Sequence, residues 1–471
     1  MYDDPVVYDV AIIGAGVVGA AIARELAKYQ VRLALVEAAP DVGMGTSKAN
    51  PAIWHPGFDA TPGSLEAQLL RRGYPLLGEF MAAAGVPIER LGALLVAWTA
   101  EQEAALPALL ARAHDNGVTD VRPVSAQEIY QREPHLQSGV RAGLFVPGEG
   151  ILCTFSLPLA YATQAVLNGV TLKLNHRVQA LVRGEDGHHR LHTSGGVVCA
   201  RFLVNAAGLY ADEIDRMAGH QRFTVTPRRG QLIVFDKLAR PLLNHILLPT
   251  PTATTKGVLI SPTVYGNILL GPTAEDLPDK TDTGTSVEGL QQLLEKGQAL
   301  LPALLREEVT AIYAGLRAAT EHKDYQIELY PDEQYLCVGG IRSTGVSASL
   351  GIAAYVVDQV ATQLTLAPKA TFVPVQMPAI GEAQVRPYQS SQLIAANPDY
   401  GRVVCFCERV TVGELKAAAC GPLPARTLDG LRRRTRVMQG RCQGFNCQAA
   451  AATLLAQESK QTVQQLLALE T

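Results

Sequence analysis

The sequence contains no run of about 18 uncharged apolar residues, so it predicts no transmembrane helix. It also lacks an excess of positive charge, because its net charge is -3 at pH 7. A chain without a broad basic surface is not expected to have nucleic acid as its main partner. The first residues, Met-Tyr-Asp-Asp-Pro, lack the basic and apolar regions of a signal peptide. We therefore expect a cytoplasmic protein.

The length and composition predict a globular protein of several domains. The chain has 471 residues, of which 48% are hydrophobic and 18% are charged. Because a single hydrophobic core stops growing well below this length, two or three domains are expected.

The N-terminal stretch has the pattern of a dinucleotide-binding unit. Val10 to Ile13 form a short β-branched run typical of a buried parallel strand, and an apolar helix is predicted over 18–26. Between them, Gly14 permits a tight turn, Gly16 lets a pyrophosphate approach the backbone, and Gly19 allows close helix packing. The start of the helix then faces the phosphate charge.

A second strand, Val31 to Val36, ends at Glu37, which lies 18 residues after Gly19. A carboxylate in this position can accept hydrogen bonds from the adenosine ribose hydroxyls. The complete order of strand, glycines, helix, strand and acid favours a dinucleotide, but by itself it leaves NAD and FAD equally open.

Two later segments have a similar form. The strand Phe202 to Val204 leads into Asn205-Ala-Ala-Gly208, and the stretch from Tyr335 to Gly345 leads into another apolar helix. Both bring backbone or a helix N-terminus towards one extended ligand. Since the chain has only one GxGxxG, it provides no second unit for NAD, which favours FAD.

The middle and the end of the chain differ from the N-terminal region. Alternating strands at 231–235, 258–261 and 267–271 predict an antiparallel sheet. Residues 367–400 are irregular and contain prolines, so we predict a linker there. A small separate domain is expected to follow.

Four of the eight cysteines are grouped near the C-terminus. Cys405 and Cys407 form a C-x-C pair, and after 34 residues Cys442 and Cys447 form a C-x4-C pair. In a reducing compartment this grouping favours a metal site over disulfides. Four thiolates are the usual ligands of a [2Fe-2S] cluster, whereas the C-x-C spacing is uncommon for zinc, which remains the alternative. The other four are expected to be buried small hydrophobes: Cys153, Cys199, Cys337 and Cys420.

At this point the chain resembles a known family. The glycine motif, Glu37, Asn205-Ala-Ala-Gly208 and Gly339-Gly-Ile-Arg-Ser-Thr-Gly345 are similar to the D-amino-acid oxidase type of flavoprotein. Within it, the stretches 46–59, 256–263 and 315–317 look closest to FAD-dependent glycerol-3-phosphate dehydrogenases and L-2-hydroxyglutarate dehydrogenases. The cysteine-containing tail resembles the bacterioferritin-associated ferredoxin-like domain. The combination implies FAD in the first domain and a [2Fe-2S] cluster in the second.

The resemblance implies a fold of class α/β and α+β. A Rossmann-type FAD-binding domain would carry an inserted antiparallel-sheet substrate domain and be followed by a small C-terminal helical cysteine-cluster domain. The expected ranges are 1–366 for the oxidoreductase region (FAD-binding segments about 6–60, 150–215 and 335–365; substrate-domain segments about 61–149 and 216–334), 367–400 for the linker, and 401–471 for the [2Fe-2S] domain.

The resemblance also assigns cofactor residues. The positions expected to hold FAD are Gly14, Gly16, Gly19, Glu37, Ser47, Val178, Ala207, Gly208, Gly340, Ser343 and Thr344. Ser47 would lie near the ring, Val178 would seat the adenine through its backbone, and the helix that starts near Thr344 would direct its positive end towards the flavin. The cluster ligands would be Cys405, Cys407, Cys442 and Cys447.

Three residues are predicted for the reaction itself. His55 is the expected general base, because an imidazole suits proton removal near neutral pH. Arg317 is the expected anchor of an anionic substrate, because its planar fork fits a carboxylate or a phosphate. Lys256 is a second candidate for that role.

The predicted activity is dehydrogenation of a small anionic hydroxy compound, with sn-glycerol 3-phosphate first, L-2-hydroxyglutarate second, and an amine or imino acid third. Electrons would pass through the cluster to a partner subunit or to a membrane quinone system, with peripheral attachment to the inner face of the cell membrane as an open alternative. A different class of function is also open, in which the cluster is an iron-sensing or docking module.

Several other side chains are given structural roles. The histidines within 187–192 are expected to be solvated loop residues, and Arg228 and Arg229 are expected to form structural ion pairs. The basic residues of 432–436 and Arg441 are expected to offset the negative charge of the thiolates and the cluster.

Overall fold

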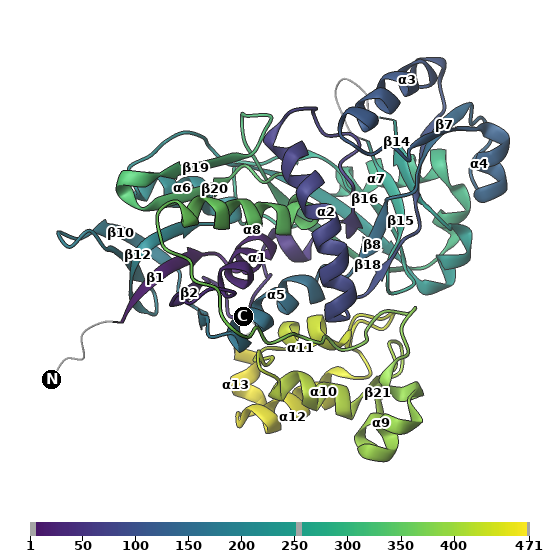
Figure 1. Ribbon diagram of the computed structural model, residues 1–471. Helices are drawn as coiled ribbons and strands as arrows, with labels where there is room; N and C mark the ends of the chain where they lie inside the picture. Colours follow the sequence, from purple (N-terminus) through teal and green to yellow (C-terminus); the bar gives the residue numbers. More distant parts are fainter. Residues whose placement is uncertain (1–5, 251–256, 469–471) are drawn as a thin grey trace.

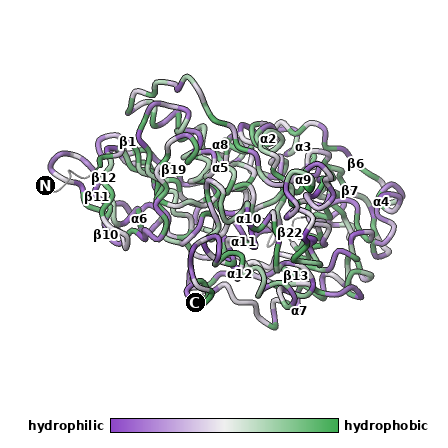
Figure 2. The backbone as a smooth tube through the Cα atoms, turned by 90° about the horizontal axis from the view of Figure 1, so that it is seen from below, coloured by the Kyte–Doolittle hydropathy of each residue, from purple (hydrophilic) through white to green (hydrophobic). Residues whose placement is uncertain are grey.

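The computed structural model describes residues 6–250 and 257–468. Figure 1 shows two sheets side by side, each with helices packed against it, and a smaller helical domain beneath them. In Figure 2, seen from the side of this helical domain, its helices lie across the middle of the molecule. No helix in the described part of the chain has the length and apolar character needed to cross a membrane.

The first sheet is built from segments that are far apart in the sequence. Its eight strands within the described residues are β1 (Val7–Ile13), β2 (Leu33–Val36), β9 (Thr171–Lys173), β10 (Val178–Arg183), β11 (His189–Thr193), β12 (Gly196–Asn205), β19 (Gln326–Tyr330) and β20 (Tyr335–Gly339). The central order β20-β12-β1-β2-β9 is parallel, while β10, β11 and β19 pair antiparallel. The parallel strands end at one edge, where open α/β sheets bind their ligands.

Apolar helices cover this sheet. The helices α1 (Val17–Leu26), α5 (Ser156–Leu167) and α8 (Gly345–Ala361) lie close together, and α2 (Leu65–Ala84) packs on α8. The strand residues Val10 and Ile12 and the helix residues Ile22 and Leu26 have no exposed surface. The close packing of α2 on α8 depends on Gly351, where a Cβ would lie 2.0 Å from the carbonyl oxygen of Leu69.

The second sheet forms the inserted domain. Within the described residues it contains β5 (Ala93–Ala97), β6 (Arg122–Ser125), β7 (Ala142–Val146), β13 (Thr226–Phe235), β14 (Ile246–Pro249), β15 (Leu259–Pro262), β16 (Ile268–Gly271), β17 (Glu275–Asp276) and β18 (Val309–Ala319). The predicted antiparallel pattern holds except between β14 and β5, which run parallel. The helices of this domain are α3 (Ala100–Asp115), α4 (Ala126–Arg132) and α7 (Val287–Leu300).

A small three-stranded sheet carries a part of the candidate site. Its strands are β3 (Ile53–Trp54), β8 (Gly150–Leu152) and β4 (Ile88–Glu89). The antiparallel register pairs Trp54 with Gly150. The residues that adjoin this pair, His55 and Glu149, are therefore brought together although 94 positions separate them.

The C-terminal domain has its own small core. It consists of β21 (Val403–Cys405), β22 (Val410–Thr411), α10 (Val412–Cys420), α11 (Leu428–Thr435), α12 (Gln448–Ser459) and α13 (Val463–Ala468). Buried apolar residues such as Leu415, Leu431 and Leu455 hold these elements together. Cys405 and Cys447 belong to the same core, so the cysteine pairs are fixed by it.

The segment 367–400, predicted as a linker, lies against the rest of the protein. Its backbone donates hydrogen bonds to the ends of two helices. The Lys369 N–H donates to the carbonyl oxygen of Lys28, just after α1, and the Met377 N–H donates to that of Ala84, the last residue of α2, both at 2.8 Å. It contains the short helix α9 (Ser391–Ala396), and Ile380 and Arg386 are buried. The chain therefore follows the surface of the first domain before it enters the C-terminal domain.

Candidate functional site: a cofactor cradle and a cysteine cluster

The glycine turn after β1 is shaped so closely that side chains would not fit. Gly14 has φ +98°, and a Cβ on it would lie 2.5 Å from the carbonyl oxygen of Ala206. A Cβ on Gly19 would lie 1.9 Å from the carbonyl oxygen of Gly14. The first of these contacts places the second predicted segment, 205–208, directly beside the turn, as a shared cofactor site requires.

Two helix N-termini are open towards this place. Gly16 is the N-cap residue of α1 and Thr344 that of α8; neither of these two residues caps its helix through its own side chain, and neither helix has an acid in its first turn. The first N–H of α1, that of Val17, donates to the Oγ of Ser47 at 2.9 Å, and among the described residues the following N–H groups of its first turn are left for a ligand. Uncapped N–H groups and the helix dipole together favour a negatively charged ligand.

Glu37 lies at the end of β2 against the glycine turn. Its carboxylate accepts hydrogen bonds from the backbone N–H of Ala15 at 2.7 Å and of Ala39 at 2.9 Å. Burial raises the pKa of this carboxyl group, and the backbone N–H groups oppose that shift. The acid is therefore held at the edge of the sheet, where the ribose of a dinucleotide is expected.

The remaining predicted cofactor residues lie in the first sheet and in the loops that follow its strands. Gly208 has φ +60°, and no atom lies within 4 Å of the position that its Cβ would take. Gly340 also has a positive φ, +64°, while Ser343 is exposed. Val178 starts β10, and Ala207 follows the end of β12; both are half-buried.

Next to the N-terminus of α8, one buried polar atom has no partner. The Nε of Arg342 forms no hydrogen bond within the part of the chain that the structure describes, although its Nη2 donates to Glu66 at 2.9 Å. Thr344 donates to the other oxygen of Glu66 at 2.6 Å. An unpaired donor beside an uncapped helix fits a polar cofactor at this position.

His55 lies between two carboxylates. Its Nδ1 is 2.6 Å from an oxygen of Glu149, and its Nε2 is 3.0 Å from an oxygen of Asp59. Burial lowers the pKa of His55, but the two acids outweigh it and raise the pKa to about 10. The ring is therefore an imidazolium at neutral pH, and its backbone N–H is fixed to Ser347 of α8 at 2.9 Å.

Arg317, in β18, is a largely buried guanidinium that forms no ion pair within the described residues. Its Nη2 donates to the carbonyl oxygen of Thr273 at 3.0 Å. Burial, together with the neighbouring Arg228, lowers its pKa to about 10, and the nearby carboxylate of Asp276 opposes that shift. The segment before His55 packs on the same strand, since Thr46 donates to the Leu316 carbonyl at 2.7 Å and Tyr313 donates to the Asn50 carbonyl at 3.1 Å. Lys256, the other predicted anchor, lies outside the described residues.

The four tail cysteines come together as two pairs. The thiols of Cys405 and Cys447 are within hydrogen-bonding reach of each other, and so are those of Cys407 and Cys442. Within the described ranges no group of three or more His, Cys, Asp or Glu side chains is arranged to hold a single metal ion. Two pairs of thiolates suit two irons, each of which takes two of the sulfurs.

The loop between the last two cysteines directs backbone N–H groups at one of them. The backbone N–H groups of Asn446, Gly444 and Phe445 point at the sulfur of Cys442 and lower its pKa, chiefly through Asn446. Gly444, with φ +93°, permits the turn of this loop. Several N–H groups directed at one sulfur fit a ligand of an iron-sulfur cluster.

Comparison with known proteins assigns both parts of the chain to families. Residues 9–359 match the model of the FAD dependent oxidoreductase family, and residues 403–457 match that of the BFD-like [2Fe-2S] binding domain. The chain belongs to the FAD dependent oxidoreductase family. As a member of this family it has an FAD-binding domain, and its tail is a [2Fe-2S]-binding domain.

Named relatives include enzymes of glycerol 3-phosphate. A glycerol 3-phosphate dehydrogenase of Caloramator mitchellensis is 35% identical over 96% of this chain and 94% of its own length. A mitochondrial L-2-hydroxyglutarate dehydrogenase of Caenorhabditis elegans is 31% identical, over 57% of this chain and 63% of its own length. The solved L-alpha-glycerophosphate oxidase of Mycoplasma pneumoniae, with FAD bound, superposes with a TM-score of 0.75 at 28% identity, covering 80% of this chain and all of that one.

Two basic residues of the cluster domain, Arg433 and Arg434, do not act as predicted. Arg433 and Arg434 bind Asp41 of the FAD-binding domain, Arg436 pairs with Glu408 at 3.1 Å, and Arg441 pairs with Asp236 at 2.8 Å. The prediction that they offset the cluster charge is wrong for Arg433 and Arg434. Their charge is neutralised at the domain interface, because the interface buries the carboxylate of Asp41 opposite them.

The other side chains with predicted structural roles lie partly as expected and partly not. Arg228 and Arg229 do form ion pairs, with Asp276 at 2.6 Å and with Glu275 at 2.7 Å. His189 is buried and bonds to the Glu333 carbonyl, so the prediction of a solvated histidine is wrong there, while His192 is exposed. Three of the scattered cysteines are buried, but Cys420 is exposed.

Sequence reasoning missed Asp59, Glu149 and Asp41. Asp59 could have been found, because its spacing of four from His55 places it within the same motif. Glu149 is brought to His55 only by the pairing of β3 with β8, and Asp41 gains its partners only through the docking of the C-terminal domain. The sequence carries no local signal for the last two.

Proposed function

We propose that this flavoprotein is a dehydrogenase that oxidises sn-glycerol 3-phosphate and exports the electrons through its [2Fe-2S] cluster to an external acceptor. The observation that carries the proposal is Arg317, a largely buried guanidinium that forms no ion pair within the described residues. A cation placed in this way is costly unless an anion joins it, so it is suited to bind an anionic substrate.

We propose that the substrate hydroxyl proton is taken up by Asp59, His55 and Glu149 acting together. With His55 protonated, the three residues carry one net negative charge, so they can accept one proton. Because its pKa is raised, His55 already carries a proton at neutral pH, and both of its ring nitrogens contact carboxylates. A neutral imidazole acting alone as the base is therefore not what we propose. His55 would then transmit the proton to a carboxylate.

Bound FAD supplies a two-electron acceptor, whereas a [2Fe-2S] cluster passes single electrons. The presence of both domains in one chain supports transfer to a separate carrier, either a protein subunit or a membrane quinone system. The identity of that carrier and a peripheral attachment to the membrane belong to the proposal. Cytoplasmic location is likewise proposed.

L-2-hydroxyglutarate is the second candidate substrate. The forked donor set of Arg317 fits a carboxylate as well as a phosphate, and the relative from Caenorhabditis elegans is named for this substrate. An amine or imino acid is the third candidate.

Anaerobic mixing with each candidate tests the substrate. Flavin absorbance should bleach with sn-glycerol 3-phosphate, and dithionite serves as the control for a reducible flavin. If L-2-hydroxyglutarate or an imino acid bleaches the flavin while glycerol 3-phosphate does not, the first assignment is wrong.

Cys442→Ser separates the electron-transfer proposal from an iron-sensing or docking role. If the cluster carries electrons, substrate should still bleach the flavin, but turnover with the natural acceptor should be lost. If turnover with that acceptor is retained in a variant that lacks the cluster absorbance, the cluster is not on the electron path.

A further inference from the structure

The loop that follows Glu37 contains a buried acid that binds the C-terminal domain. Asp41 is 4% exposed, and its carboxylate accepts hydrogen bonds from Arg433 at 2.6 Å and from the two Nη atoms of Arg434 at 2.5 and 2.9 Å. These bonds lower the pKa of Asp41 against the effect of burial. One carboxylate thus joins two guanidinium groups from another domain.

Both arginines are held rigidly in α11 of the cluster domain. Arg433 also donates to the Val42 carbonyl oxygen and to Asp429, both at 2.9 Å. Arg434 donates to the Leu423 carbonyl oxygen at 3.1 Å. Since both side chains are buried, loss of Asp41 would leave their charge without its main partner.

The same loop is fixed to the turn that binds the cofactor phosphates. The backbone N–H of Gly43 donates to the carbonyl oxygen of Ala15, which lies between the glycines of the motif, at 2.9 Å. On the other side, Lys48 pairs with Asp429 of α11 at 3.6 Å, and its neighbour Ser47 accepts from the first N–H of α1. The helix α11 therefore contacts both loops that border the N-terminus of α1.

We propose that α11 of the cluster domain holds the phosphate-binding turn of the FAD site in its binding shape. Docking of the cluster domain and FAD binding would then be coupled: a cluster domain that is displaced weakens FAD binding, and FAD stabilises docking by the same factor. Asp41 is the positioning residue in this coupling, because it connects α11 to the turn without belonging to the motif.

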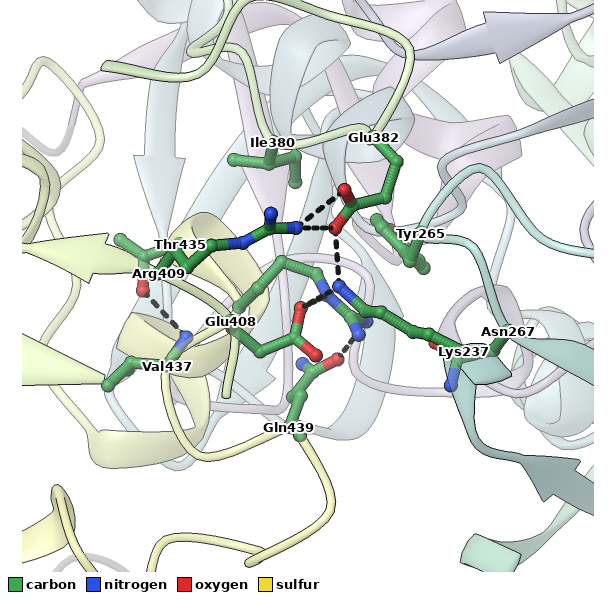
Figure 3. A network of polar contacts seen from close by, with 12 residues as sticks. Lys237, Tyr265, Asn267, Ile380, Glu382, Glu408, Arg409, Thr435, Val437 and Gln439 are labelled. Atoms are coloured by element: carbon green, nitrogen blue, oxygen red, sulfur yellow. Dashed lines mark hydrogen bonds and ion pairs between the residues drawn. The ribbon is translucent and has the colours of Figure 1, made fainter. Parts of the chain in front are cut away.

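The interface offers a matched control at its other end. Lys237 of the substrate domain pairs with Glu408 of the cluster domain at 3.1 Å and with Glu382 of the connecting segment, which in turn binds Arg409 (Figure 3). This group also joins the domains through charge, but it contacts the substrate domain rather than the FAD loops. Its loss should weaken docking without reaching the glycine turn directly.

The test uses the full-length chain with its cluster and with FAD removed. FAD is titrated while the quenching of flavin fluorescence is followed, and cluster content is checked by absorbance. We expect Asp41→Asn to raise the dissociation constant of FAD at least tenfold and Lys237→Gln to change it less than twofold. Saturating FAD should also slow proteolysis of the segment 367–400 in the wild type and do so less in Asp41→Asn.

Three results would overturn the proposal. The first is an FAD affinity of Asp41→Asn within twofold of the wild type. The second is a loss of FAD affinity in Lys237→Gln as large as that in Asp41→Asn, which would mean that any undocking of the cluster domain has this effect. If Asp41→Asn does not fold, Arg433→Lys decides, because it keeps the charge but loses the contact with Val42; an unchanged affinity there is the third. None of these measurements uses a substrate, so they leave the proposed reaction untouched.

Discussion

Two groups of partly or fully buried arginines differ in what neutralises them. Arg433 and Arg434 share the carboxylate of Asp41, whereas Arg317 forms no ion pair within the described residues and donates to a carbonyl oxygen. A buried charge with its partner inside the protein contributes to holding the domains together. A buried charge without an ion-pair partner raises the free energy of the empty site. Binding of an anion removes this cost and therefore becomes more favourable.

The largest expected effect follows from breaking the paired group. Asp41→Asn should lower the free energy of unfolding by about 3–5 kcal/mol, because two buried guanidinium groups lose their shared carboxylate. Urea unfolding followed by circular dichroism measures it. Asp276→Asn, which removes the half-exposed partner of Arg228, is the control. Equal shifts in the two variants would contradict the contrast between buried and exposed pairs.

His55 and its two carboxylates should make the stability of the protein depend on pH. The pKa of His55 is raised to about 10 in the folded state, so the imidazolium stabilises the fold fully below the unfolded pKa of histidine, about 6.5. That stabilisation is lost progressively as the pH rises through 10. Wild type and His55→Gln should therefore converge in stability between pH 6.5 and 10 in urea titrations. Parallel curves would mean that His55 is not held as an imidazolium.

The unpaired arginine should show the opposite behaviour to Asp41. Arg317→Gln should lower kcat/KM for the anionic substrate about 100-fold, or about 2.7 kcal/mol, with little loss of stability. Steady-state kinetics and urea unfolding on the same samples provide the comparison. Arg317→Lys is the matched variant, since it keeps the charge but loses the planar fork of donors. Its kcat/KM should lie between those of the wild type and of Arg317→Gln. A loss of stability as large as that of Asp41→Asn would mean that Arg317 is structural.

The smallest effect is expected at the exposed pair. Arg228 and Asp276 are each about half exposed, with side-chain values of 44% and 50%. Arg228→Gln should therefore change the free energy of unfolding by less than about 1 kcal/mol, and less still at high salt. A larger effect would mean that Arg228 acts through Arg317, which lies opposite it in the β13–β18 register.

Local elements followed closely from local residues. The helix α2 covers Leu65–Ala84, because Ser64 caps its start by accepting from the Ala67 N–H and Gly85, with φ +69°, ends it. The first strand was predicted from its apolar run alone and extends further, to Val7, because pairing with β12 orders the polar residues before it. The glycine motif was readable for the same reason, since its glycines act within a few residues of each other, whereas the cysteine pairs Cys405–Cys447 and Cys407–Cys442 form only when the C-terminal domain folds.

The contacts that distinguish one charge from another were not readable. His55 could be chosen from its motif, but its ionisation depends on Glu149, which arrives through the pairing of two short strands. The basic run in α11 could be seen, but its partner is Asp41, some 390 positions earlier.

The sequence by itself therefore determined the cofactor types, the order of the domains and the local elements, because these depend on backbone shape and spacing within short segments. Only the tertiary structure decided which charges are paired, which are free for a ligand and how the cluster domain meets the FAD loops. Such energies depend on distance and burial, which are set when remote segments pack together.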